Sequence, residues 1–192
     1  MTGKQKFIQL IYPIIEIVGK TFGGKQKVLS STENAKTSFY DLQTTTNSGA
    51  DYNFATLKNK KVLIVNTASD CGYTPQYDDL QKLYNLKKNT LEIIAFPAND
   101  FGEQEKGNDK AIESFCKINF GVSFPLMQKA VVLKNEQQSN IYNWLTDSAK
   151  NGWNTKAPSW NFCKYLIDEN GNLTHFFEAS VSPMGKEILN NL

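Results

Sequence analysis

Cys71 has a sequence context that is typical of a reactive thiol. It lies between an apolar run at residues 62–65 and a helix start indicated by Thr74 and Pro75. Unpaired N–H groups and the helix dipole at such a position favour a thiolate over a neutral thiol. The sequence therefore predicts a nucleophile at Cys71, with a pKa below that of an ordinary cysteine.

The remaining cysteines and the single histidine do not form a recognisable metal site. No CxxC pair occurs, and no cysteine stands near His175 in ligand spacing. We interpret His175 and Cys163 as packed residues of strands. The odd number of cysteines favours a reducing compartment, so we expect a cytoplasmic protein, with a periplasmic or membrane-peripheral location left open.

The composition fits one ordinary soluble domain. The chain has 192 residues, of which 40% are hydrophobic and 21% are charged, and this is enough for a sizeable core. The net charge of +2 is small, and the lysines are scattered among acidic residues. This distribution argues against a surface that binds nucleic acid.

The first residues form a separate segment with an amphipathic pattern. Residues 7–18 place six apolar side chains on one helical face: Phe7, Leu10, Ile11, Ile14, Ile15 and Val18. The segment is shorter than the roughly 18 residues that cross a bilayer, and no A-x-A-like cleavage site follows it. A helix packed on the domain, a peripheral membrane contact and an export signal all stay open. Residues 25–36 have the composition of a linker, so we divide the chain into residues 1–36 and 37–192.

The domain pattern alternates strands with helices. Residues 38–42 and 52–55 predict two short antiparallel strands around a polar turn. Residues 61–67 and 91–96 are apolar and β-branched runs, typical of strands buried on both faces. A helix with Thr74 as its N-cap lies between them, which predicts two parallel strands joined by a right-handed crossover.

The second half of the chain continues this alternation. A helix is predicted after Asn108, followed by a strand at residues 130–133 and a helix through residues 141–145. A β-hairpin of residues 162–168 and 173–177 comes next, and a short helix ends the chain. The predicted fold class is α/β.

Three stretches of the chain carry most of its polar motifs: residues 66–77 (NTASDCGYTPQY), residues 96–105 (FPANDFGEQE) and residues 160–162 (WNF). In this order they resemble the glutathione peroxidase family, and the resemblance extends over roughly residues 37–192. It implies a thioredoxin-like fold, in which helices flank a central mixed sheet. It also implies a peroxidase that needs no bound cofactor.

The resemblance assigns roles to four residues. Cys71 would attack a hydroperoxide and become a sulfenic acid. Gln104, Trp160 and Asn161 would hydrogen-bond the sulfur and the peroxide, and so stabilise the charge that develops in the reaction. These four residues form the predicted catalytic set.

Three residues near Gln104 are expected to affect the backbone of the loop that carries it. We expect Asn99 to hold the loop backbone rather than to take part in catalysis. Glu103 and Lys106 replace the Gly and Pro that usually flank the glutamine in the family. We therefore expect the loop backbone to differ there.

By the same resemblance, Cys116 is the resolving cysteine, which attacks the sulfenic acid. Cys116 and Cys71 are 45 residues apart (116 − 71). We expect the helix of Cys116 to unwind or swing, because Cα atoms more than about 7 Å apart cannot be bridged by a disulfide. A packed and inert Cys116 is the alternative. Thioredoxin is the expected reductant, glutathione is the other candidate co-substrate, and a monomer is the expected state.

A second class of function stays open. A peroxide sensor or disulfide-relay protein would use the same thiols but pass oxidation to a client protein. A peroxidase turns over continuously with thioredoxin, whereas a relay stalls without its client. The sequence does not distinguish hydrogen peroxide from organic hydroperoxides, although an exposed site and a membrane-contacting N-terminus would together favour lipid hydroperoxides.

Overall fold

The computed structural model describes residues 2–3, 6, 10–11 and 27–192. The predicted amphipathic helix over residues 7–18 lies outside the described residues, apart from two positions. Within the described ranges, no helix is both long and apolar enough to cross a membrane.

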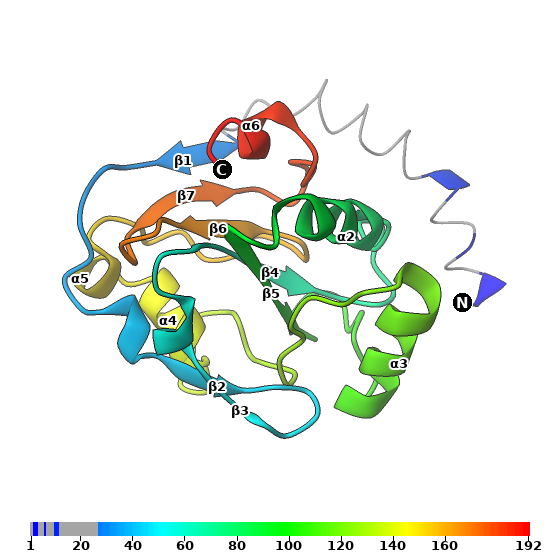
Figure 1. Cartoon of the computed structure of the whole chain (residues 1–192). Helices are drawn as coiled ribbons and strands as arrows, with labels where there is room; N and C mark the ends of the chain where they lie inside the picture. The colour runs from blue at the N-terminus through cyan, green and yellow to red at the C-terminus, as the bar shows by residue number, and fades with distance from the viewer. Residues whose placement is uncertain (1, 4–5, 7–9, 12–26) are drawn as a thin grey trace.

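A five-stranded mixed sheet forms the centre of the domain (Figure 1), with the strand order β1-β7-β6-β4-β5. Its strands are β1 (Val28–Ser30), β4 (Lys61–Thr67), β5 (Leu91–Pro97), β6 (Lys164–Ile167) and β7 (Leu173–Phe177). β4 and β5 are parallel, and the other neighbouring pairs are antiparallel. The predicted crossover and the terminal hairpin are confirmed. The continuous apolar sequence of β4 and β5 follows from burial on both faces of the sheet.

Helices cover the two faces of this sheet, as Figure 1 shows. One face carries α2 (Gln76–Lys87), α3 (Asp109–Phe120) and α6 (Lys186–Leu189), and the other carries α4 (Asn140–Leu145) and the 3-10 helices η1 (Phe39–Asp41) and η2 (Phe54–Leu57). Alternate residues of β4 supply both cores, because successive strand side chains point to opposite faces. Cys71 and Cys116 both lie in the core under α2 and α3.

The predicted strand at residues 38–42 is wrong, and the predicted strand at residues 52–55 is confirmed only at Tyr52 and Asn53. Ser38 and Asn53 accept hydrogen bonds from N–H groups two residues ahead, at 3.2 and 2.8 Å, and each thereby caps a 3-10 helix. The antiparallel hairpin lies between these helices, in β2 (Gln43–Thr45) and β3 (Asp51–Asn53).

The predicted strand at residues 130–133 is also wrong. The chain pairs with β5 slightly earlier, where the N–H of Met127 donates to the carbonyl of Ala95 at 2.9 Å. The N–H of Val132 donates instead to the carboxylate of Asp100 at 3.0 Å. A side chain therefore takes the hydrogen bond that a strand ladder would need.

The segment assigned to a linker contributes the edge strand β1, which pairs with β7. Three residues are too few to show the alternation by which strands are recognised in a sequence. The sheet therefore begins before residue 37, the predicted start of the domain.

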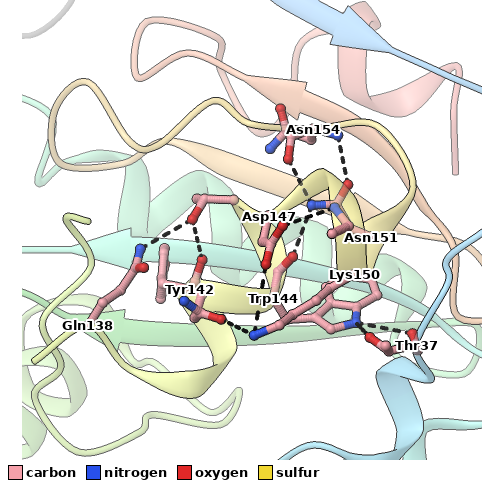
Figure 2. Close-up of polar contacts among 11 residues, drawn as sticks. Thr37, Gln138, Tyr142, Trp144, Asp147, Lys150, Asn151 and Asn154 are labelled. Carbon is pink, nitrogen blue, oxygen red and sulfur yellow. Dashed lines mark hydrogen bonds and ion pairs between the residues drawn. The ribbon is translucent and has the colours of Figure 1, made fainter. Parts of the chain in front are cut away.

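A polar network fixes the connection from α4 to α5 (Ser148–Asn151) and onward towards residues 160–162 (Figure 2). The amide of Asn151 donates to the carbonyls of Trp144 and Asn154, at 2.9 and 2.8 Å. The amide of Asn154 donates to the carbonyl of Leu145 at 2.7 Å, and the indole of Trp144 donates to the carbonyl of Thr37 at 3.1 Å. These buried amides hold an otherwise irregular segment in one conformation.

Candidate active site

Cys71 lies in the turn between β4 and α2, and its side chain is fully buried. The hydroxyl of Thr74 accepts the N–H of Cys71 at 3.0 Å and donates to the carbonyl of Ala68 at 2.8 Å. The helix itself begins only at Gln76 and has no side-chain cap. The prediction that Thr74 caps the helix is therefore wrong, because its hydroxyl closes the turn of Cys71 instead.

The Cys71 thiol faces three hydrogen-bond donors. The backbone nitrogen of Tyr73 lies 3.4 Å from Sγ, and the side chains of Trp160 and Asn161 also act to lower the pKa of this thiol. Burial raises the pKa of Cys71, and this effect outweighs the three donors, which lower it. The predicted direction of the pKa shift is therefore wrong, since tertiary burial exceeds the effect of the turn.

A buried asparagine of β4 holds the turn that carries Trp160 and Asn161. The amide of Asn66 donates to the carbonyl of Trp160 at 3.0 Å and accepts the N–H of Cys163 at 3.1 Å. The carbonyl of Asn66 also accepts the N–H of Phe162 at 2.6 Å. One residue thereby fixes three backbone groups of the turn across 94 or more positions of sequence.

Phe162, the next residue after Asn161, has a left-handed backbone with φ of 67°. This conformation is unfavourable for a bulky residue and costs of order 1 kcal/mol. The Phe162 ring is fully buried and meets the ring of Tyr77 edge-on at 5.4 Å. Packing and the bond to Asn66 therefore hold a strained residue beside the catalytic set.

Gln104 completes the set. Its Oε1 accepts the amide of Asn161 at 3.0 Å, and its carbonyl accepts the N–H of Asp70 at 3.1 Å. The ring of Trp160 packs on Phe101 at 5.6 Å and remains 38% exposed. The structure thus brings together the four residues that the sequence places 90 positions apart.

The loop around Gln104 has a non-glycine residue in a backbone conformation that favours glycine. Glu103 has φ of 51°, in the left-handed region that favours glycine, and its carboxylate lies 2.8 Å from the ammonium of Lys106. Asn99 accepts the N–H of Glu105 at 2.9 Å, which is the structural role expected for it.

Glu105 is a buried residue of the site that sequence reasoning did not single out. Its carboxylate accepts the hydroxyl of Ser69 at 3.0 Å, two residues before Cys71. Burial raises the pKa of Glu105 to about 7. The signal in the sequence for Glu105 was an acidic residue directly after the predicted catalytic glutamine. For Asn66, which sequence reasoning also missed, it was a polar residue within an apolar strand.

Cys116 lies on the inner face of α3, fully buried. Burial raises its pKa to about 12, and the charge of Glu105 adds to this, while the hydroxyl of Tyr77 acts against it. Cys71, Cys116 and Cys163 are free thiols in the structure.

His175 has no role in the predicted catalytic set. His175 is on β7, where its ring stacks on Phe177 at 5.5 Å. Among the described residues, no three His, Cys, Asp or Glu side chains gather as metal ligands.

A cavity of about 400 Å³ borders the site between the active-site loops and α3. Ser69, Gln104 and Glu105 line it on one side, and Ile112 and Phe115 of α3 line it on the other. The cavity therefore lies between the segment that holds Cys71 and the helix that holds Cys116.

Comparison with known sequences identifies the family. The sequence model for glutathione peroxidase matches residues 39–146. The chain belongs to the glutathione peroxidase family. It is 41% identical over 148 residues to glutathione peroxidase-like peroxiredoxin 2 of Saccharomyces cerevisiae. The aligned residues cover 77% of this chain and 91% of that protein. It is 43% identical to glutathione peroxidase-like peroxiredoxin GPX5 of Chlamydomonas reinhardtii, over 81% of this chain and 99% of that protein.

Solved structures agree with this assignment to the glutathione peroxidase family. T. cruzi GPX1 has a TM-score of 0.60 at 29% identity, covering 80% of this chain and 92% of that chain. A DsbF homologue from Corynebacterium diphtheriae has a TM-score of 0.62 at 14% identity, over 88% and 96% of the two chains, and this likeness concerns the fold alone. The protein is therefore a thiol peroxidase with a thioredoxin-like fold.

Proposed function

We propose that the enzyme reduces hydrogen peroxide and organic hydroperoxides through a sulfenic acid on Cys71. The sulfur attacks the terminal peroxide oxygen, an S–O bond forms and the O–O bond breaks. The thiol loses one proton and the departing oxygen takes up one proton, so the product that leaves is water or an alcohol. The clustering of hydrogen-bond donors around this one buried thiol carries the proposal.

In this proposal, Trp160, Asn161 and Gln104 stabilise charge. The two donors on Cys71 favour the thiolate against the effect of burial. The hydrogen bond between Asn161 and Gln104 fixes both amides, so that the N–H groups of the Gln104 amide can serve the departing oxygen without reorganisation. The adjoining cavity has room for a small hydroperoxide.

We further propose that Cys116 resolves the sulfenic acid. Its thiolate attacks the Cys71 sulfur, an S–S bond forms, the S–O bond breaks, and the hydroxide leaves as water after taking a proton. The high pKa of Cys116 and its position in the middle of α3 favour a step in which this helix first loosens. Exposure to solvent would lower the pKa of the thiol towards its ordinary value.

The proposed reductant is a dithiol protein of the thioredoxin type, since such a protein reduces a disulfide through a mixed-disulfide intermediate. The word peroxiredoxin in the names of the yeast and algal relatives supports this proposal. A cytoplasmic monomer remains part of the proposal.

The test couples NADPH oxidation through thioredoxin reductase and thioredoxin to hydrogen peroxide. We expect no turnover in Cys71→Ser, and in Cys116→Ser a single stoichiometric peroxide reduction without steady turnover. Ser114→Ala, a change at an exposed residue of the helix that carries Cys116, is the control and should turn over like the parent. Full turnover of Cys116→Ser would show that an external thiol recycles Cys71, and a parent enzyme that stalls after one turnover would favour a disulfide relay.

A further inference from the structure

Glu178, which directly follows β7, holds both ends of the turn that carries Trp160 and Asn161. Its Oε2 accepts a hydrogen bond from the hydroxyl of Ser159 and lies 3.8 Å from the thiol of Cys163. The Ser159 oxygen and the Cys163 sulfur are themselves 3.6 Å apart. One carboxylate oxygen therefore joins the residue before Trp160 to the second residue after Asn161.

The carboxylate of Glu178 is in turn fixed to the rest of the domain. Its Oε1 lies 3.4 Å from the ammonium of Lys156, and its backbone N–H donates to the carbonyl of Lys27 at 2.9 Å. The backbone of Lys156 is held by Asn154, which accepts its N–H at 3.1 Å and donates to its carbonyl at 3.2 Å. Asn154 belongs to the network of Figure 2, so the cluster connects that network to the catalytic turn.

The Cys163 thiol has the chemistry of a hydrogen-bond donor in this cluster. Burial raises its pKa, and the charge of Glu178 adds to this effect. The thiol therefore stays protonated and donates to the carboxylate. Asn66 holds backbone groups of the same turn, whereas Glu178 holds the side chains at its ends.

We propose that Glu178 is a positioning residue of the peroxidase reaction, which acts through Ser159 and Cys163 to keep Trp160 and Asn161 against Cys71. This inference rests on the proposed role of Trp160 and Asn161 as donors to the sulfur. It gives Cys163 a structural task and leaves redox chemistry to the other two thiols. A catalytic group needs such support, because a displacement of about 1 Å can cost a large factor in rate.

The test uses the full chain carrying Cys116→Ser, so that oxidation stops at the sulfenic acid. Two quantities are measured: the second-order rate constant of Cys71 oxidation by hydrogen peroxide, and the pH dependence of Cys71 alkylation, read from the Cys71 peptide by mass spectrometry. In Glu178→Ala we expect oxidation to slow about tenfold. We also expect the alkylation midpoint to move to higher pH, because the sulfur loses donors that favour the thiolate.

Conservative variants distinguish positioning from general stability. Glu178→Gln keeps an acceptor oxygen for Ser159 and should recover most of the lost rate. Ser159→Ala removes one exposed hydroxyl, leaves a folded protein and should slow oxidation about threefold. Thr155→Ala, a change at another exposed residue of the same connection, is the matched control and should behave like the parent.

The outcomes separate this inference from the proposed function. If Glu178→Ala and Ser159→Ala lower the unfolding temperature but keep the parental rate and alkylation midpoint, the cluster only stabilises the fold and the inference is wrong. If Asn161→Ala, measured in parallel, also keeps the parental rate, the donor role itself is wrong. A slow Asn161→Ala with a parental Glu178→Ala overturns the positioning role alone.

Discussion

Cys71 and Cys116 are equally buried and lie in the same apolar core, yet their surroundings differ. Cys71 sits in a turn and meets three hydrogen-bond donors, from Tyr73, Trp160 and Asn161. Cys116 sits in the middle of α3 and meets one tyrosine hydroxyl and the charge of a buried carboxyl group.

This difference separates two kinds of buried thiol. Burial raises the pKa of both, so burial alone would make both inert. Donors aimed at the sulfur oppose that effect at Cys71, and the turn leaves the residue outside a helical ladder. At Cys116 the helix and a nearby carboxyl group favour the neutral thiol. Reactivity in this core therefore depends on hydrogen-bond partners and backbone setting.

Removing one of the hydrogen-bond donors around Cys71 should make the reactivity of this thiol more like that of Cys116. In Asn161→Ala we expect Cys71 oxidation to slow about a hundredfold, because an amide that stabilises developing charge is lost. Peroxide consumption at a series of quenched time points, in the Cys116→Ser background, measures this oxidation rate. Asn140→Ala, which removes an exposed amide that bonds a backbone carbonyl, is the matched control. A rate within twofold of the parent would contradict the assigned role.

Removing the carboxyl group should make Cys116 more like Cys71. Folding raises the pKa of Glu105 from 4.5 to about 7, so its contribution to stability is full below pH 4.5 and is lost as the pH rises through about 7. Glutamine does not titrate. The unfolding free energy of Glu105→Gln, relative to that of the parent, should therefore rise by about 2 kcal/mol as the pH increases from about 4 to about 8. This figure includes an allowance for solvent screening.

Urea unfolding at several pH values measures this gain, and Cys116 alkylation should move to lower pH in the same variant. A stability difference that does not change with pH would show that the Glu105 pKa is not raised. Ser69→Ala serves as the control, since it removes the hydrogen bond to Glu105 and keeps the carboxyl group.

Weakening α3 should speed the step in which Cys116 leaves the core. Asn108 caps this helix by accepting the N–H of Ala111 at 2.9 Å, and such a cap contributes about 1 kcal/mol. Asn108→Ala should therefore form the disulfide about fivefold faster after peroxide addition, with an unchanged rate of Cys71 oxidation. Ser139→Ala removes the cap of α4 instead and should change neither rate. An unaltered disulfide rate in Asn108→Ala would mean that α3 need not unwind.

The smallest expected effect concerns Tyr77, whose hydroxyl acts on Cys116. The hydroxyl of Tyr77 lowers the pKa of Cys116, while its ring packs on Phe120 and Phe162 at 5.4 Å. Tyr77→Phe keeps the ring and should slow disulfide formation about threefold, because the resolving thiolate loses a donor. Acid-quenched time points measure the disulfide. Faster formation would show that the hydroxyl restrains Cys116 in the helix.

The four residues of the predicted catalytic set stand in ordered motifs of the sequence, and the structure brings them together. The sequence also predicts β4 and β7 at their observed bounds, since long apolar or β-branched runs dominate their local preferences. It fails at residues 38–42 and 130–133, where a polar side chain such as Ser38 or Asp100 takes a backbone hydrogen bond. Such competition depends on geometry that periodicity does not describe.

The electrostatics of the site were less predictable. The direction of the Cys71 pKa shift depends on burial in a core to which residues distant in sequence, such as Phe162 and Val181, contribute. The hydrogen bonds of Asn66 and those of the cluster around Glu178 join positions far apart in the chain. A single sequence shows that these residues are polar but not which turn they hold.

Trp160 gives the enzyme an intrinsic optical reporter. Of the three indoles in the chain, it alone influences the pKa of the Cys71 thiol. The indoles of Trp144 and Trp153 donate to backbone carbonyls in the other core, at 3.1 and 2.6 Å. Replacing Trp144 and Trp153 with phenylalanine should therefore leave a single indole whose fluorescence reports each oxidation of Cys71 without a label.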